Sequence, residues 1–143
     1  MASARGRVPA AGNQNERWLL DILLFNSVSA AAGGISVSGD FVGFPLAWLR
    51  HSPFHSYLIP GLVLFVVVGG SAVLAAVAVL REAARARELT MLSGIIMAGW
   101  VVSELAFVRL FSFLQVLYFA TGIAVIMLAP AASNRSAASS ARR

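Results

Sequence analysis

The segment Tyr57–Leu80, YLIPGLVLFVVVGGSAVLAAVAVL, sets the class of this protein, because it is continuously apolar and contains no charged residue. A helix of about 20 apolar residues spans the roughly 30 Å hydrocarbon core of a bilayer. Pro60 falls in the first turn of this helix, where a missing backbone N–H costs little. The segment is therefore predicted to be a transmembrane helix.

Three further apolar stretches of similar length are found at residues 18–37, 89–110 and 112–129. The last two are almost continuous, and one helix over 89–129 would be about 60 Å long, twice the bilayer core. The chain must therefore fold back, and Arg109 and Ser112 mark the turn. These stretches predict an all-α membrane fold, a four-helix transmembrane bundle built as two helical hairpins.

The composition fits one membrane domain over residues 18–129 between two short polar tails. Of the 143 residues, 59% are hydrophobic and only 12% are charged, which is far from a typical soluble domain. We expect the tails, residues 1–17 and 130–143, to be disordered and cytoplasmic. The absence of cysteine excludes disulfides and thiolate chemistry.

The first stretch, WLLDILLFNSVSAAAGGISV, has an alternative reading as a secretory signal, because basic residues precede it and small residues follow. Asp21 interrupts its apolar region, and its leader is long. We therefore expect a retained transmembrane helix, with Asp21 as an intramembrane acid near the cytoplasmic face that reaches water or pairs with Arg17.

Arginine predicts the orientation of the helices. Residues 1–17, 81–88 and 130–143 hold three arginines each, whereas the opposite side holds only Arg50 and Arg109. The positive-inside rule then places both termini in the cytoplasm. The net charge of +5 is explained by these flanking residues, so we expect no nucleic-acid partner. Arginine without lysine, with abundant alanine, indicates a GC-rich bacterial genome.

The long loop at residues 38–56 is aromatic and is predicted to lie on the outer membrane surface. Its PLAWLR stretch, which begins at Pro45, predicts a short interfacial helix. His51 and His55 have the spacing of two metal ligands on a helix, but Pro53 lies between them and only Asp40 is near. We expect no metal site and no cofactor.

A carboxylate inside the third stretch is the strongest candidate for a polar site, because a charge in hydrocarbon is costly and should face the bundle interior. The predicted site lies in the outer half of the bundle. The alternative is a structural clasp that holds a hairpin together. The residues of this site are Glu104, Arg109, Gln115, Arg50 and His51.

Small residues at helical spacing predict where the helices approach each other closely. A lipid-lined groove is the alternative for the same residues. The predicted packing residues are Ser27, Ala30, Ala31, Gly34, Gly69, Gly70, Gly94, Ala98 and Gly122.

Two motifs, SPF-x-x-YLIPG at residues 52–61 and FLQ-x-x-YF at residues 113–119, carry a resemblance. With them, residues 19–129 resemble an uncharacterised family of small four-span bacterial inner-membrane proteins. The resemblance implies the four-span architecture and a bacterial inner membrane. It implies no activity.

No catalytic triad, phosphate loop or haem-type histidine pair is present in the sequence. We therefore expect a non-enzymatic accessory or scaffold subunit, whose partners are the lipid bilayer and either a larger membrane protein or a second copy. The alternatives are a small transporter or channel component with Glu104 in the path, and an outer-leaflet lipid-active enzyme that uses Glu104 as acid or base.

Overall fold

The computed structural model describes residues 11–39, 43, 55–108 and 112–133, and the regular structure within them is helical throughout. In chain order the elements are α1 (Ala11–Ser38), α2 (Leu58–Val63), the π-helix η2 (Leu64–Gly69), α3 (Gly70–Leu80), α4 (Ala86–Val108), α5 (Phe113–Leu128) and the 3-10 helix η3 (Ala129–Ser133).

The described residues contain four helical segments that are long and apolar enough to cross a membrane. The second is made by α2, η2 and α3 in succession. The prediction of an all-α fold with four transmembrane helices is confirmed, and the chain is a multi-pass membrane protein. The four spans are Gln14–Ser38, Leu58–Leu80, Ala86–Ala106 and Phe113–Ala132.

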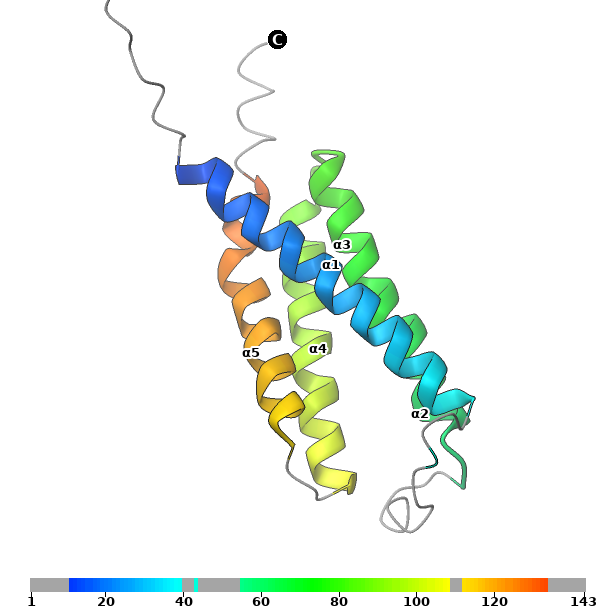
Figure 1. The fold of residues 1–143 in the computed structure, drawn as a ribbon. Helices are drawn as coiled ribbons and strands as arrows, with labels where there is room; N and C mark the ends of the chain where they lie inside the picture. The colour runs from blue at the N-terminus through cyan, green and yellow to red at the C-terminus, as the bar shows by residue number, and fades with distance from the viewer. Residues whose placement is uncertain (1–10, 40–42, 44–54, 109–111, 134–143) are drawn as a thin grey trace, which may run out of the picture.

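The four spans form two antiparallel hairpins (Figure 1). The first hairpin is α1 with α2, η2 and α3, and the second is α4 with α5. The start of α1, the α3–α4 turn and η3 share one end of the bundle, which we call the terminal end. The end of α1, the start of α2, the end of α4 and the start of α5 lie at the opposite end, which we call the loop end.

The helices extend beyond the predicted boundaries at the terminal end. α1 begins at Ala11, so residues 11–17 are helical where a disordered tail was predicted. The continued burial of Glu16, on the same face as Leu19, accounts for this extension. At the other tail, η3 continues the helix past Pro130, because Ala131 and Ala132 are buried in the bundle. The predicted interfacial helix after Pro45 lies outside the described residues.

Two buried apolar clusters hold the bundle together. The terminal cluster joins α1, α3, α4, α5 and η3, and the middle cluster lies closer to the loop end. Lipid tails are as apolar as these side chains, so close van der Waals contact, not exclusion of water, stabilises them. The terminal cluster is Leu19, Leu23, Ala72, Ala75, Ala78, Val79, Ala86, Val125 and Ala132; the middle cluster is Ala30, Val68 and Met97, with Leu64, Ile96, Trp100 and Tyr118 against it.

Each hairpin contains one crossing at which two backbones approach closely. In the first, a Cβ added at Gly34 would lie 2.7 Å from the Gly61 carbonyl oxygen. In the second, a Cβ added at Gly94 would lie 2.7 Å from the Gly122 carbonyl oxygen. Only glycine leaves room for such an approach, as at other small-residue contacts between membrane helices.

Candidate functional site

The carboxylate and amide side chains of the described bundle interior lie at three levels. Glu16 and Asn26 are on the buried face of α1, 4% and 2% exposed, and about 15 Å apart along the helix axis. Glu104 is on α4 towards the loop end and is half-buried. Carboxylate or amide groups are thus found near each end and near the middle of the described interior.

Apolar side chains separate these three levels. Leu19 and Leu23, both fully buried in the terminal cluster, lie between Glu16 and Asn26. Met97 of the middle cluster, 4% exposed, and Trp100 precede Glu104 along α4. Apolar side chains therefore separate the carboxylates and Asn26 from one another along the described part of the bundle.

Hydroxyl groups within the spans donate hydrogen bonds to carbonyl oxygens of their own helices. Ser27 Oγ donates to Leu24 O at 2.8 Å, and Thr90 Oγ1 donates to Ala86 O at 2.8 Å. Such bonds satisfy a hydroxyl in hydrocarbon and leave it a poor donor to a ligand. The same pattern is seen for Ser29 with Phe25, Ser38 with Gly34, Ser71 with Val68, Ser103 with Gly99 and Thr121 with Tyr118.

Asn26 differs from these hydroxyl-bearing side chains. Its Oδ1 atom is buried and accepts no hydrogen bond from the described residues. An unsatisfied buried acceptor costs about 1–3 kcal/mol. The sequence places Asn26 among small residues, and its helical register relative to Leu19 and Leu23 turns it inward.

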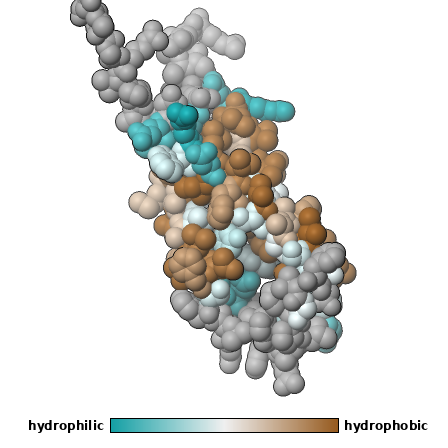
Figure 2. Space-filling model, in the orientation of Figure 1, coloured by the Kyte–Doolittle hydropathy of each residue, from teal (hydrophilic) through white to brown (hydrophobic). Residues whose placement is uncertain are grey.

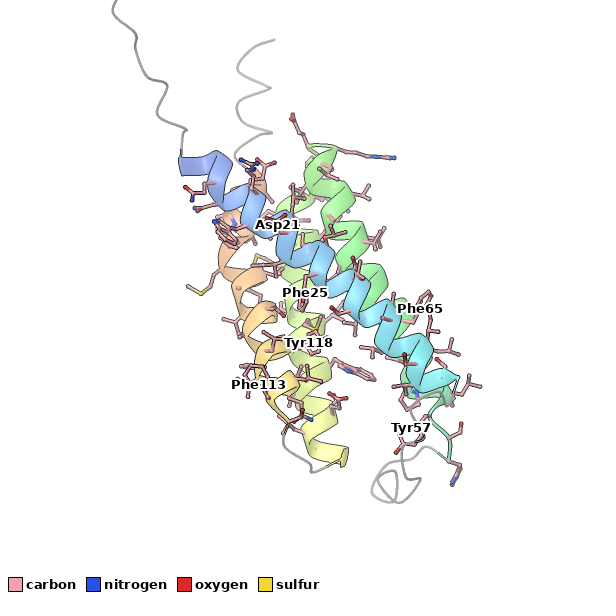
Figure 3. The ribbon with its side chains drawn as sticks, in the orientation of Figure 1. Asp21, Phe25, Tyr57, Phe65, Phe113 and Tyr118 are labelled. Carbon is pink, nitrogen blue, oxygen red and sulfur yellow. The ribbon has the colours of Figure 1, made fainter. Side chains whose placement is uncertain are left out.

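Asp21, predicted as an intramembrane acid near the cytoplasmic face, is exposed on α1 towards the terminal end (Figure 3). It forms no ion pair with Arg17 in the described part of the chain. One helical turn further along α1, the exposed Phe25 stacks its ring on that of Tyr118 of α5, with ring centroids 6.1 Å apart.

Gln115, predicted as a member of the polar site, caps α5. Its Oε1 accepts a hydrogen bond from the Ser112 backbone N–H at 3.0 Å, and Ser112 Oγ accepts one from the Leu114 N–H at 3.3 Å. This reciprocal arrangement is a capping box. The Ser112-x-x-Gln115 spacing is its sequence signature, and it would have identified this role.

Of the predicted polar site, the structure describes only Glu104 and Gln115. These two side chains form no hydrogen bond with each other. Glu104 also forms no ion pair within residues 11–39, 55–108 and 112–133. Arg50, His51 and Arg109 lie outside the described residues. No three His, Asp or Glu side chains in the described segments are grouped so that they could hold a metal ion.

The predicted packing residues divide into three groups. Gly34, Gly94 and Gly122 lie at the close crossings, and a Cβ added at Gly122 would lie 3.2 Å from the Ala98 nitrogen. Ala30 and Ser27 are buried, and an added Cβ at Gly69 would make ordinary contact with Ala30, whereas Ala31 is half-buried. A Cβ added at Gly70 would meet nothing within 4 Å.

No protein-family model, curated protein or solved structure matches this chain. The resemblance based on the SPF-x-x-YLIPG and FLQ-x-x-YF motifs therefore stays a prediction.

Proposed function

We propose that this protein is a non-enzymatic accessory or scaffold subunit of a bacterial inner membrane. One observation carries the proposal: two apolar clusters separate Glu16, Asn26 and Glu104 from one another in the described interior. Catalysis needs several polar groups at one place, and transport needs a path between the two sides. The described interior provides neither.

Both termini are proposed to lie in the cytoplasm. Arg17, Arg81, Arg85 and Arg87 are all exposed at the terminal end, where hydrophilic residues gather, and hydrophobic residues cover the middle of the bundle (Figure 2). An excess of arginine next to membrane spans is typical of the cytoplasmic side. Alkaline phosphatase fused at either terminus should be inactive, and a fluorescent protein fused there should fluoresce. The reverse pattern would contradict this orientation.

Photo-crosslinking in intact cells tests the subunit proposal. A photoreactive amino acid is placed at outward positions on different helices, at Leu24 of α1, Leu74 of α3 and Met127 of α5, which are 61%, 62% and 75% exposed. A subunit should give one discrete, stoichiometric protein adduct from one face and only lipid adducts from the others. Lipid adducts from every face would contradict the proposal.

A transporter or channel component is the second candidate, and the half-buried Glu104 without an ion pair in the described chain favours it. Purified protein in vesicles that contain a pH-sensitive dye separates the two functions. A scaffold should leave proton leakage at the level of empty vesicles. Leakage that is lost in Glu104→Gln but kept in Glu88→Gln, an exposed carboxylate of the same helix, would favour transport.

A further inference from the structure

α1 lies on one side of the bundle (Figure 1), where it packs on α2, η2, α3, α5 and η3. It has no extended contact with α4, which belongs to the other side. The residues on the outer side of α1 are exposed, from Arg17 near its start to Ile35 near its end. This outer side is therefore a helix face that is open to the bilayer or to another protein.

The outer side of α1 follows a regular repeat, in which the spacing alternates between four and three residues. We call its members the α1 seam. Five of the six are exposed, and Ala31 is half-buried. A period of about 3.5 residues keeps one face of a helix against a second helix along its length, as in a left-handed coiled coil. The seam residues are Arg17, Asp21, Leu24, Val28, Ala31 and Ile35.

The apolar members of the seam have the residue types of a parallel helix pair. Val28 and Ile35 occupy one position of the repeat, and Leu24 occupies the other. β-branched residues at the first position of such a repeat and leucine at the second favour two parallel helices. Ala31 is a small residue, which lets two membrane helices approach closely. The seam therefore fits a parallel helix that carries the same pattern.

Asp21 adds a requirement for charge. It follows Gln14, the start of the first span, by seven residues, which is about 10 Å along the helix, and it is exposed. A carboxylate at this depth is costly unless it meets a cation. Arg17 precedes it by one turn, yet the two form no ion pair in the described part of the chain. A base that precedes an acid by four residues is the less favourable order for a pair within one helix.

A second copy of the chain meets both requirements. Copies inserted with the same orientation bring their α1 helices together in parallel, and a two-fold axis between them makes the contact self-complementary. Arg17 of each copy then lies one turn from Asp21 of the other, so two ion pairs form across the axis. The apolar seam residues face their own counterparts in the same arrangement.

We propose that the protein forms a parallel, two-fold symmetric dimer through the α1 seam, with Arg17 of each copy paired to Asp21 of the other. This dimer rests on the subunit role proposed above, and it names the face and the partner of that subunit.

Disulfide cross-linking tests the interface, because the chain has no cysteine of its own. Val28→Cys, in cell membranes treated with copper phenanthroline, should give a disulfide-linked dimer. Leu74→Cys of α3 and Met127→Cys of α5 are the matched controls, since both positions are exposed outside the seam, and they should remain monomeric. Cross-linking of all three variants to the same extent, or of none, would overturn the proposal.

Charge reversal tests the two ion pairs. Copies with a donor or an acceptor dye at the C-terminus are mixed in vesicles, and energy transfer reports their association. Arg17→Asp leaves only acids at this level and Asp21→Arg leaves only bases, so each variant alone should dimerise about tenfold more weakly than the parent. Single variants that dimerise like the parent would overturn the proposal.

A mixture of the two single variants keeps this test independent of folding. Each copy then carries the charge that the other lacks, so energy transfer between Arg17→Asp and Asp21→Arg copies should return to the parent level. The mixture contains the same two proteins that were measured alone, and a folding defect would persist in it. A mixture that associates no more strongly than its components would overturn the proposal.

Photo-crosslinking separates failure of this dimer from failure of the subunit role. A photoreactive amino acid at Leu24 should give an adduct with the mass of two chains. A protein adduct only from Leu74 or Met127 would overturn the dimer and leave the subunit role in place. Lipid adducts from all three positions would overturn both.

Discussion

The two ends of this bundle are held together in different ways. At the terminal end, one apolar cluster around Leu19 and Leu23 joins residues of all four spans. Towards the loop end, the glycine crossing of Gly34 with Gly61 holds the first hairpin, but α2 has no extended contact with α4 or α5 of the second. Since lipid competes equally well for apolar side chains, only closely fitted contacts persist in a membrane. We therefore expect the two hairpins, which the terminal and middle clusters join, to vary their separation most at the loop end.

The largest expected effect on stability comes from a substitution that separates the two helices of the second hairpin. In Gly94→Ala, the new Cβ would lie 2.7 Å from the Gly122 carbonyl oxygen and from Ile126 Cγ1, so the backbones of α4 and α5 must separate. We expect a loss of about 3 kcal/mol in the free energy of unfolding, measured by steric trapping in bicelles.

Gly99→Ala is the matched control for this substitution, because a Cβ at Gly99 meets nothing within 4 Å. It should be neutral or stabilise the helix by about 0.5–1 kcal/mol. Equal effects of the two substitutions would show that α4 and α5 are not in close contact in the membrane.

The second largest effect comes from weakening the terminal cluster, which joins the two hairpins. Leu23→Ala removes a fully buried side chain from the terminal cluster. The loss in the free energy of unfolding should be smaller than in soluble cores, where such a substitution costs about 2–5 kcal/mol, since no transfer from water is involved. Leu24→Ala, at an outward position on the same helix, should change the stability by less than about 0.5 kcal/mol.

Leu23→Ala should also widen the distribution of distances between the two hairpins. The chain has no cysteine, so spin labels can be attached at Leu58→Cys of α2 and Phe113→Cys of α5, both exposed at the loop end. Double electron–electron resonance should give a broader distance distribution in Leu23→Ala than in Leu24→Ala. Identical distributions would contradict a joint at the terminal cluster.

A smaller effect concerns the start of α5. Ser112→Ala removes the hydroxyl of the capping box and should cost about 1 kcal/mol, with faster amide exchange at Leu114. Ser103→Ala is the control, because that hydroxyl bonds to its own helix at Gly99. Unchanged exchange at Leu114 would mean that the cap does not form in the bilayer.

The smallest effect, of opposite sign, concerns the middle of the bundle. Asn26→Leu replaces a buried amide whose Oδ1 lacks a hydrogen bond from the described residues. It should leave the stability unchanged or raise it by up to about 1 kcal/mol in the same assay. A loss as large as that of Leu23→Ala would show that a water molecule or a partner satisfies Asn26 in the membrane.

The positions of the spans were predictable from hydropathy, and so was the division of the long apolar stretch into α4 and α5. The start of α1 was missed, because Glu16 looks like a residue of a solvated tail until its register with Leu19 is considered. The cap formed by Gln115 was missed although Ser112-x-x-Gln115 is visible in the sequence, because a polar residue near Glu104 was interpreted as part of a site. The register of Asn26, not its residue type, turned it inward.

The sequence by itself determined that the chain forms four apolar helices, because the length and hydropathy of a segment set its free energy in a bilayer. Only the tertiary structure decided which glycines serve as contacts. Gly94 and Gly99 are similar in sequence context and lie on one helix, yet Gly94 meets the backbone of α5 and Gly99 meets nothing within 4 Å. The crossing of two helices makes this distinction, since a side chain's neighbours depend on the face that it occupies and on the helix that reaches that face.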